Sequence, residues 1–211
     1  MNVLELFAGS RSIGKIAEER GHQVFSVDIN NFENIDLVKN ILQVQKKDIL
    51  FDPDLIWASP PCTCFSVASI GYHWNKDNTP KTKQAVKGIE ILNKTLEIIS
   101  WYPKAIFYIE NPRGKIRKII NNIDRKTVTY CSYGDTRMKP TDIWSNNFYN
   151  VFNLKGFKPK EICFNSNPNC NHEKAPRGTK RGTQGIKGNY NRSKIPNMLC
   201  LEIIKSVENC L

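Results

Sequence analysis

Short apolar runs separated by polar turns dominate the first 150 residues of the chain. The clearest runs span four or five residues, are rich in apolar side chains, and lie at 3–7, 23–27, 55–58 and 105–109, with further candidates at 47–49, 126–130 and 142–145. Continuous apolar runs of this length are typical of strands that are buried on both faces of a sheet. The pattern therefore predicts an open sheet built from these segments.

Helical spacing of apolar residues fills several of the intervals between these runs. Residues 13–20 predict a helix that Gly21 ends, and residues 83–101 predict a long helix. A last helical pattern covers 195–207, with Pro196 at a suitable first-turn position. Because strand and helix alternate, we expect an α/β fold with a doubly wound, mostly parallel sheet.

The periodicity ends at about residue 152, where Gly, Asn, Pro and basic residues take over. Residues 153–194 hold ten Lys and Arg against two Glu, so most of the net charge of +11 lies in this segment. We predict a core over 1–150, a small irregular basic insertion over 151–194, and a C-terminal helix over 195–211 that packs back on the core. Such a basic segment suits a polyanionic partner such as nucleic acid.

The cysteine content and the start of the chain concern the cellular compartment. The seven cysteines are an odd number, and the first residues form a strand pattern without the basic and apolar regions of an export signal. We expect reduced thiols and a cytoplasmic protein. No run of about 18 apolar residues occurs, so we expect no membrane span.

Three residues of the insertion have side chains that bind metals. Cys163, Cys170 and His172 hint at zinc, but their Cys-x6-Cys-x-His spacing is irregular and has no apparent fourth ligand. We therefore predict no metal.

Two chemically active side chains follow neighbouring predicted strands. The strand at 55–58 runs into Ser-Pro-Pro-Cys, which ends at Cys62, and the strand at 105–109 runs into Glu110. Ligands of open parallel sheets bind at the carboxyl ends of the strands, so both side chains should face one cleft. Cys62 is then a candidate nucleophile, with Cys64 as a rival, and a partly desolvated Glu110 could carry a proton. A structural cysteine and a helix-capping glutamate are the alternative interpretations.

The first turn is a candidate nucleotide site. Gly9 lets the backbone approach a ligand, and Asp28 lies about 20 residues further on, where many α/β units bind a ribose. A tight turn and a solvated carboxylate explain this pair equally well. Asp48 is a weaker candidate for an adenine contact. Arg137 and Lys139, in a later turn, could bring positive charge to a substrate or a phosphate.

In this order, these residues resemble the cytosine-5 DNA methyltransferase family in a compact phage-like or prophage-like form. Residues 7–9 (Phe-Ala-Gly) are similar to the family's cofactor turn, and residues 61–66 (Pro-Cys-Thr-Cys-Phe-Ser) to its nucleophile motif. Glu110 and Asn111 match its Glu-Asn motif. The likeness covers about 2–145 and, more weakly, 193–207, and it assigns the attack to Cys62 rather than Cys64.

The resemblance implies a Rossmann-like enzyme that uses S-adenosylmethionine to methylate carbon 5 of cytosine in double-stranded DNA, and it suggests a restriction-modification setting. The catalytic residues it implies are Cys62, Glu110 and Arg137. The cofactor-binding residues are Phe7, Ala8, Gly9, Ser10, Asp28, Ile29, Asp48, Ile49 and Pro60. The expected DNA contacts are Ser66 and, in a basic glycine-rich stretch that could also be a solvated loop, Arg177, Lys180, Arg181, Thr183 and Gln184.

The implied mechanism agrees with the chemistry of the base. Carbon 5 of cytosine is a poor nucleophile until a thiolate adds at carbon 6 while Glu110 protonates or hydrogen-bonds ring N3. The ring faces are inaccessible in a duplex, so the base should flip out of the stack. Residues 69–80 are the candidate lid over it.

The sequence also departs from the family pattern. Arg11 and Ser12 replace the usual later glycines of the cofactor turn, and the recognition segment has only about 40 residues. Recognition is therefore minimal, or a protein partner or an oligomer completes it. Three alternatives stay open: an exocyclic-amino DNA methyltransferase, which shares the Ser-Pro-Pro element, an inactive nucleic-acid-binding relative, and an RNA methyltransferase.

Overall fold

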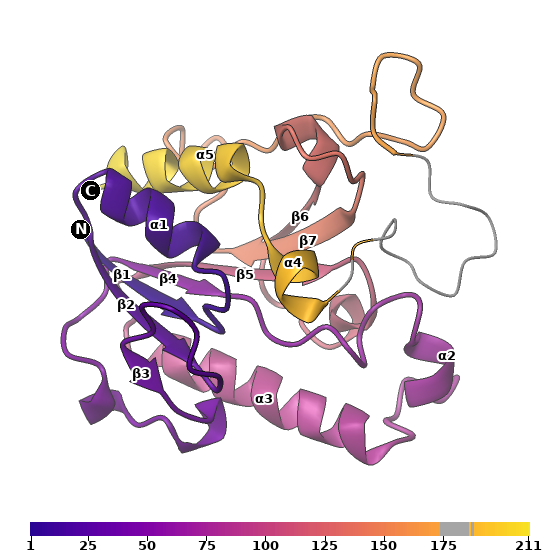
Figure 1. Cartoon of the computed structure of the whole chain (residues 1–211), viewed down its shortest axis with the longest axis horizontal. Coiled ribbons are helices and arrows are strands. Elements are labelled where there is room, and N and C mark those ends of the chain that lie inside the picture. Colours follow the sequence, from indigo (N-terminus) through magenta and orange to yellow (C-terminus); the bar gives the residue numbers. More distant parts are fainter. Residues whose placement is uncertain (174–185, 187) are drawn as a thin grey trace.

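A seven-stranded sheet with helices on both faces forms the centre of the computed structural model, which describes residues 1–173, 186 and 188–211 (Figure 1). The strand order is β3-β2-β1-β4-β5-β7-β6. Neighbouring strands are parallel except that β7 runs antiparallel to both β5 and β6. The strands are β1 (Asn2–Leu6), β2 (Gln23–Asp28), β3 (Leu37–Val38), β4 (Leu55–Ala58), β5 (Ile106–Pro112), β6 (Arg125–Thr129) and β7 (Pro140–Ser145). The doubly wound, mostly parallel sheet is confirmed.

The long helices cover opposite faces of the sheet. Helices α1 (Ser12–Glu19) and α5 (Asn197–Glu208) pack together on one face, and α3 (Lys83–Ser100) covers the other (Figure 1). All three predicted helices are present. The shorter elements are α2 (Ile70–His73), α4 (Asn189–Ser193) and the 3-10 turns η1 (Ile41–Gln43), η2 (Lys46–Asp48), η3 (Lys115–Lys118) and η4 (Tyr130–Tyr133).

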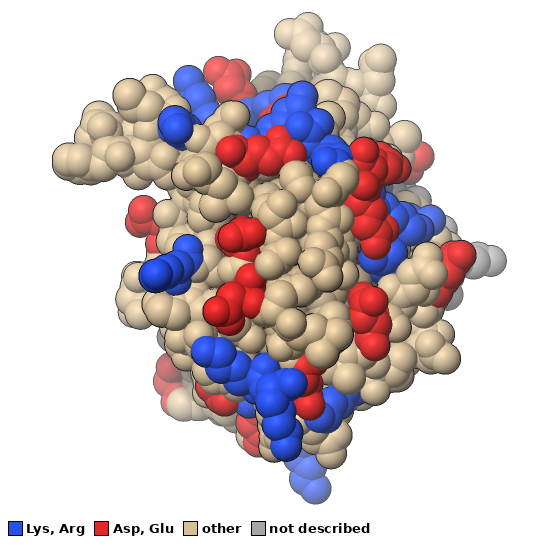
Figure 2. Space-filling model, turned by 90° about the vertical axis from the view of Figure 1, so that its left-hand side faces the viewer, with Lys and Arg blue, Asp and Glu red and all other residues tan. Residues whose placement is uncertain are grey.

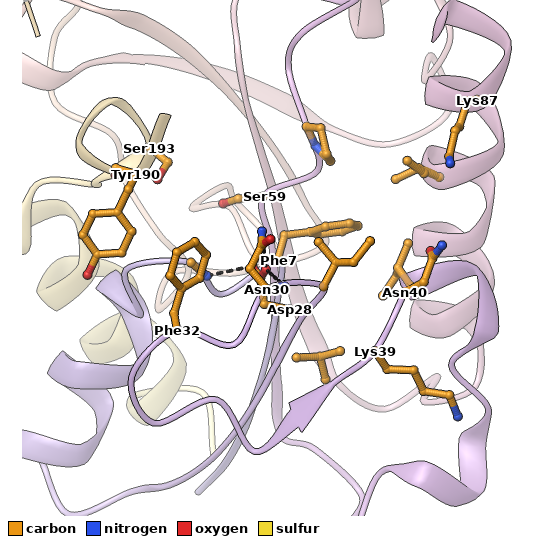
Figure 3. A pocket seen from close by; sticks show the side chains of 16 residues that line it. Phe7, Asp28, Asn30, Phe32, Lys39, Asn40, Ser59, Lys87, Tyr190 and Ser193 are labelled. Carbon is orange, nitrogen blue, oxygen red and sulfur yellow. Dashed lines mark hydrogen bonds between the residues drawn. The ribbon is translucent and has the colours of Figure 1, made fainter. Parts of the chain in front are cut away.

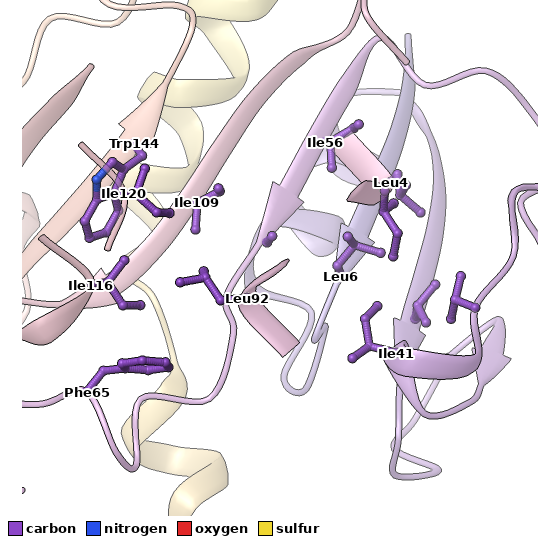
Figure 4. Close-up of a cluster of buried hydrophobic side chains, with 14 of the residues drawn as sticks. Leu4, Leu6, Ile41, Ile56, Phe65, Leu92, Ile109, Ile116, Ile120 and Trp144 are labelled. Carbon is purple, nitrogen blue, oxygen red and sulfur yellow. The ribbon is translucent and has the colours of Figure 1, made fainter. Parts of the chain in front are cut away.

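The core on each face follows the alternation of side chains along the strands. In β4, Leu55 and Trp57 belong to the cluster under α1 and α5, while Ile56 belongs to the cluster on the α3 side. Figure 4 shows this second cluster, where Ile56 of the sheet and Leu92 of α3 are both fully buried. Each such burial stabilises the fold by about 1.5–3 kcal/mol. The strand ends that carry the candidate site are thus held on a rigid sheet.

One predicted strand is wrong. Residues 47–49 do not pair with the sheet, because local hydrogen bonds hold the chain in η2: the Gln45 N–H donates to the Asp48 carboxylate at 2.8 Å and the Asp48 N–H donates to the Gln45 carbonyl at 3.0 Å. The third strand is the two-residue β3 instead. Helix and strand do not alternate strictly either: β3 follows β2 with no helix between them, and only 3-10 turns separate β3 from β4 and the strands after β5.

The insertion is irregular over 151–173, apart from isolated bridges, but its end contains α4 (Asn189–Ser193). The predicted DNA contacts Arg177, Lys180, Arg181, Thr183 and Gln184 lie outside the described residues. The division of the chain into three parts stays a prediction.

The surface and the hydropathy add two observations. The face that carries the chain ends mixes positive and negative side chains over its area (Figure 2). Within the described ranges, no helix is long and apolar enough to cross a membrane.

Candidate functional site

A pocket of about 310 Å³ opens where β1, β2 and β4 end (Figure 3). Phe7 and Gly9 reach it from the turn after β1, and Asp28 and Ile29 from the end of β2. Pro61 lines it from the loop after β4. β1 and β4 are neighbours at which the chain switches from building one side of the sheet to building the other, and ligands of open α/β sheets bind at such a point.

The turn after β1 is strained, and Asp28 holds it in place. Phe7, Gly9 and Arg11 have φ values of 59°, 49° and 53°, a left-handed conformation that costs energy for the two non-glycine residues. The Gly9 N–H donates to Asp28 Oδ2 at 3.0 Å, and the Asn30 N–H donates to Asp28 Oδ1 at 2.8 Å. The carboxylate therefore fixes two backbone segments at the pocket wall.

Arg11 does not occupy the pocket, although it replaces a glycine of the family's turn. Its side chain is 4% exposed, its Nε donates to Ser26 Oγ at 3.0 Å and its guanidinium forms an ion pair with Glu18. The neighbouring Ser12 Oγ accepts the Ile195 N–H at 3.2 Å. The side chains of Arg11 and Ser12 thus make contacts inside the protein and do not line the pocket.

The outer wall of the pocket contains residues that sequence reasoning missed. Phe32 and Tyr190 face each other with ring centroids 5.3 Å apart, and Lys39 and Asn40 follow β3 (Figure 3). Tyr190 comes from α4, far along the chain. Both aromatic residues lie in polar stretches of the sequence without apolar periodicity, so no sequence signal marked them.

Five predicted cofactor residues are not among those that line this pocket. Ala8 is buried and its N–H donates to the Val27 carbonyl at 3.1 Å, while Ser10 Oγ lies 2.9 Å from Ser12 Oγ. Ile49 is a core residue. Asp48 pairs with Lys39 Nζ at 2.6 Å, and this hydrogen bond lowers the pKa of the Asp48 carboxyl. The fifth, Pro60, is buried in the loop after β4, and its carbonyl accepts a hydrogen bond that is described below.

Cys62 and Cys64 differ in accessibility. Cys62 is half-buried in the loop after β4, and the Phe65 and Ser66 N–H groups donate to its carbonyl at 3.0 Å. Cys64 is only 3% exposed and packs against Gly88 of α3, where an added Cβ would lie 2.5 Å from its Sγ. The structure therefore leaves Cys62 as the thiol that a substrate can reach.

Glu110 lies on β5, the strand next to β4, and is 5% exposed. The Tyr130 hydroxyl donates to Glu110 Oε1 at 3.0 Å, and Lys139 Nζ lies 4.0 Å from the same oxygen. The next residue, Asn111, donates its side-chain amide to the Pro60 carbonyl at 2.7 Å. This hydrogen bond joins the two motifs directly. Asn111 is the residue after Glu110, and Pro60 lies two residues before Cys62.

Burial and nearby charges set the state of the Cys62 thiol. Burial raises the pKa of Cys62, the negative charge of Glu110 raises it further, and the positive charges of Lys139 and Arg192 lower it. Burial also lowers the pKa of the Lys139 amine. Because the raising effects dominate, the thiol of the free protein is protonated at neutral pH.

Arg137, predicted to be catalytic, is engaged elsewhere. Its guanidinium forms a two-bond ion pair with Asp135 and donates to the carbonyls of Arg192 and Lys194 at 3.2 and 3.1 Å. The cation beside Glu110 is Lys139, whose φ of 28° is unusual for a residue with a side chain. Arg137 thus holds the segment that follows α4, and Lys139 brings positive charge to the site.

The predicted lid is more ordered than its composition suggests. Residues 70–73 form α2, and Trp74 is 5% exposed with its Nε1 donating to the Cys64 carbonyl at 2.7 Å. Ser66, predicted to contact DNA, is half-buried and its Oγ lies 3.1 Å from Ser69 Oγ. The segment is therefore anchored to the loop of Cys62 at its middle.

Comparisons with known proteins concern the family resemblance and the fold. No protein-family model matches the sequence. A curated relative from Frog virus 3 (isolate Goorha), named "Probable DNA (cytosine-5)-methyltransferase", is 29% identical over 220 aligned residues, which cover 97% of this chain and 99% of the relative. The resemblance expected from the motifs is confirmed at this level.

A solved structure is similar in fold. It is an E. coli prophage-encoded protein described as a "putative DNA modification methyltransferase", with a TM-score of 0.51 and 15% identity over 77% of this chain. The match covers 52% of that protein, so this chain spans about half of its length. At this identity the likeness concerns the fold alone.

Proposed function

We propose that this protein transfers a methyl group from S-adenosylmethionine to carbon 5 of cytosine in DNA, through a covalent bond between Cys62 and carbon 6 of the base. The observation that carries this proposal is the pairing of a half-buried Cys62, in the loop after β4, with a buried Glu110 on the adjacent β5, joined through Asn111 and the Pro60 carbonyl. The name of the viral relative supports the same chemistry.

Cys62 and Glu110 activate the base together. The Cys62 thiol first loses its proton to solvent; the thiolate then bonds to carbon 6 while a protonated Glu110 gives its proton to ring N3, so electron density moves toward carbon 5. Because the negative charge of Glu110 raises the pKa of Cys62, loss of that charge by protonation favours the thiolate. Lys139 and Arg192 favour the thiolate as well. After methyl transfer, a base removes the carbon 5 proton, the sulfur–carbon bond breaks and the thiol is restored.

The pocket fits S-adenosylmethionine in chemistry. Asp28 offers a carboxylate for ribose hydroxyls, and Phe7, Ile29 and Phe32 offer apolar surface for a nucleoside. When bound, this cofactor supplies an electrophilic methyl group on a sulfonium. The protein's part is to hold it beside the loop of Cys62, which Pro61 already joins to the pocket wall.

The DNA has to present its base to this cleft from the outside. Cys62 is half-buried and has to attack a face of the ring that neighbouring bases cover in a duplex, so the cytosine must flip out. The basic segment over 153–194 is the expected source of phosphate contacts, since it holds ten Lys and Arg. A protein partner or a second copy could complete recognition by so short a segment.

The inactive alternative loses its main argument. It rested on Arg11 and Ser12 in the cofactor turn, and the side chain of Arg11 turns to Ser26 and Glu18 instead of the pocket. The exocyclic-amino alternative differs in its product and does not need a thiol at position 62.

The test is bisulfite sequencing of host DNA after expression of the wild type, Cys62→Ala and Cys64→Ala. We expect 5-methylcytosine at a defined site with the wild type, none with Cys62→Ala, and retained methylation with Cys64→Ala. Methylation that persists with Cys62→Ala, or only N4-methylcytosine or N6-methyladenine on nanopore sequencing, would overturn the proposal.

A further inference from the structure

Three cysteines and a histidine converge outside the candidate active site. Cys131 lies in η4, and Cys163, Cys170 and His172 lie in the irregular insertion. Their sulfur and nitrogen atoms all lie within 4.8 Å of one another. His172 Nδ1 is 3.2 Å from Cys170 Sγ and 3.6 Å from Cys163 Sγ. The sequence shows three of these residues close together, but Cys131 comes from more than 30 residues earlier.

From this cluster we infer a zinc site with three cysteine sulfurs and His172 Nδ1 as ligands. Structural zinc is bound tetrahedrally by Cys and His, with sulfur at about 2.3 Å, which places neighbouring sulfurs roughly 3.8 Å apart. The observed spread of the four atoms needs only small side-chain movements to reach this arrangement. The prediction of no metal rested on the lack of a fourth ligand, and Cys131 is a candidate for that ligand.

The surroundings favour a metal over a disulfide. A disulfide would use two of the three sulfurs and would leave the third cysteine and the imidazole directed at it. The Asn167 side-chain amide donates to Cys163 Sγ at 3.3 Å, a contact that stabilises a thiolate ligand. Two of the ligands are buried, Cys163 at 9% and His172 at 8% exposed, although Ile162 and Phe164 on either side of Cys163 are exposed.

The site would fasten the insertion to the core. Residues 159–173 contain no regular secondary structure, and their described polar contacts with the core include a few hydrogen bonds and the ion pair of Lys160 with Glu202. The Cys163 N–H donates to Thr129 Oγ1 at 2.9 Å and the Ser132 hydroxyl donates to the Glu161 carbonyl at 3.0 Å. Both contacts meet the chain beside Cys131 (the insertion is orange in Figure 1). A metal here replaces the apolar core that such a short segment lacks.

The position of Cys131 links the metal to the candidate active site. Cys131 follows Tyr130, whose hydroxyl donates to Glu110 Oε1. A metal that fixes η4 therefore also fixes this donor, and the insertion is anchored next to the cleft where DNA is expected. The role of the zinc is structural, because all four ligands come from the protein and no position is left for a substrate.

The test begins with the wild-type chain, purified without chelators from zinc-supplemented cells. We expect one zinc per chain by mass spectrometry of metals, and X-ray absorption with three sulfur neighbours and one nitrogen. Co²⁺ in its place should give sulfur-to-cobalt charge-transfer bands and the d–d bands of a tetrahedral site. A metal-free protein, a shell of oxygen and nitrogen only, or a disulfide among the three cysteines would overturn the inference.

Variants then assign the ligands. Cys163→Ser and Cys170→Ser should each lower the zinc content at least several-fold, while Cys210→Ser, a half-buried cysteine outside the cluster, should keep one zinc per chain. Equal zinc content in all three variants would contradict the assignment. The wild-type measurements do not depend on whether the variants fold.

Discussion

The side-chain amide of Asn111 donates to the Pro60 carbonyl at 2.7 Å, and this hydrogen bond joins the loop of Cys62 to the strand of Glu110. Asn111 is 1% exposed, and its Oδ1 has no partner among the described residues. Among the described residues, the hydrogen bond that the Asn111 side chain makes is therefore the one to the Pro60 carbonyl. The bond holds the nucleophile and the acid in a fixed relation before any substrate arrives.

Removal of this bond should cost both stability and activity. We expect Asn111→Ala to lower the free energy of unfolding by about 1–3 kcal/mol, because the Pro60 carbonyl loses its partner in a buried setting. The methylation rate should fall roughly 10- to 100-fold, since small misplacements of reacting groups are costly. Urea unfolding and a tritium-transfer assay measure the two effects. Exposed Asn122→Ala is the control, and an equal loss in both variants would contradict the account.

The reactivity of Cys62 should respond to its charged neighbours. In the wild type, alkylation by iodoacetamide should rise with pH through a pKa above the ordinary value, because burial and Glu110 raise it. Glu110→Gln should lower that pKa and Lys139→Met should raise it. Rates are read from the Cys62 peptide by mass spectrometry. An unchanged pKa in Glu110→Gln would show that the two groups do not interact.

Arg137 should act by positioning α4 rather than on the reacting atoms. Its contacts are Asp135 and the carbonyls of Arg192 and Lys194, and α4 carries Tyr190 of the pocket wall. Arg137→Lys keeps the charge but loses the two-bond geometry. We expect the KM for S-adenosylmethionine to rise roughly tenfold with kcat little changed. Exposed Arg113→Lys is the control. A loss confined to kcat would restore the catalytic role.

Glu5 should make stability depend on pH. It is 2% exposed beneath the start of α1, where it accepts the Ile13 and Gly14 N–H groups, and burial raises its pKa to about 8. Between pH 4.5 and about 8, Glu5 therefore keeps its proton in the folded protein but loses it in the unfolded chain. Its contribution is present at low pH and is lost as the pH rises toward 8, by at most about 5 kcal/mol.

The comparison with Glu5→Gln isolates this effect. In urea unfolding at pH 5, 6.5 and 8, the wild type should lose stability relative to Glu5→Gln, while exposed Glu19→Gln should follow the wild type. A wild type that gains stability relative to Glu5→Gln over this range would contradict the raised pKa.

The strands and long helices could be predicted because their signals are local. The apolar run over 55–58 coincides with β4, and the spacing over 83–101 gives α3 to within a residue. The strand predicted at 47–49 was wrong, since the hydrogen bonds that Asp48 makes in the turn outweigh a weak preference of these residues for a strand. β3 has only two residues, which is too short for any periodicity.

The site could be predicted only in its parts. Cys62, Glu110 and Asp28 lie at or near the carboxyl ends of β4, β5 and β2, so their meeting at one edge of the sheet follows from parallel pairing. Tyr190 and Cys131 enter through contacts between segments far apart in the chain, and such contacts leave no local signal. The choice of Lys139 over Arg137 beside Glu110 depends on side-chain directions that the turn alone does not specify.

The most direct measurement of the central claim is covalent trapping on DNA. A duplex that carries the site found by sequencing, with 5-fluorocytosine at the target, is incubated with the protein and S-adenosylmethionine. Fluorine cannot leave as a proton does, so the adduct at carbon 6 should persist, and peptide mapping should place it on Cys62. An adduct on Cys64, or no adduct on a duplex that the protein methylates in its cytosine form, would contradict the account.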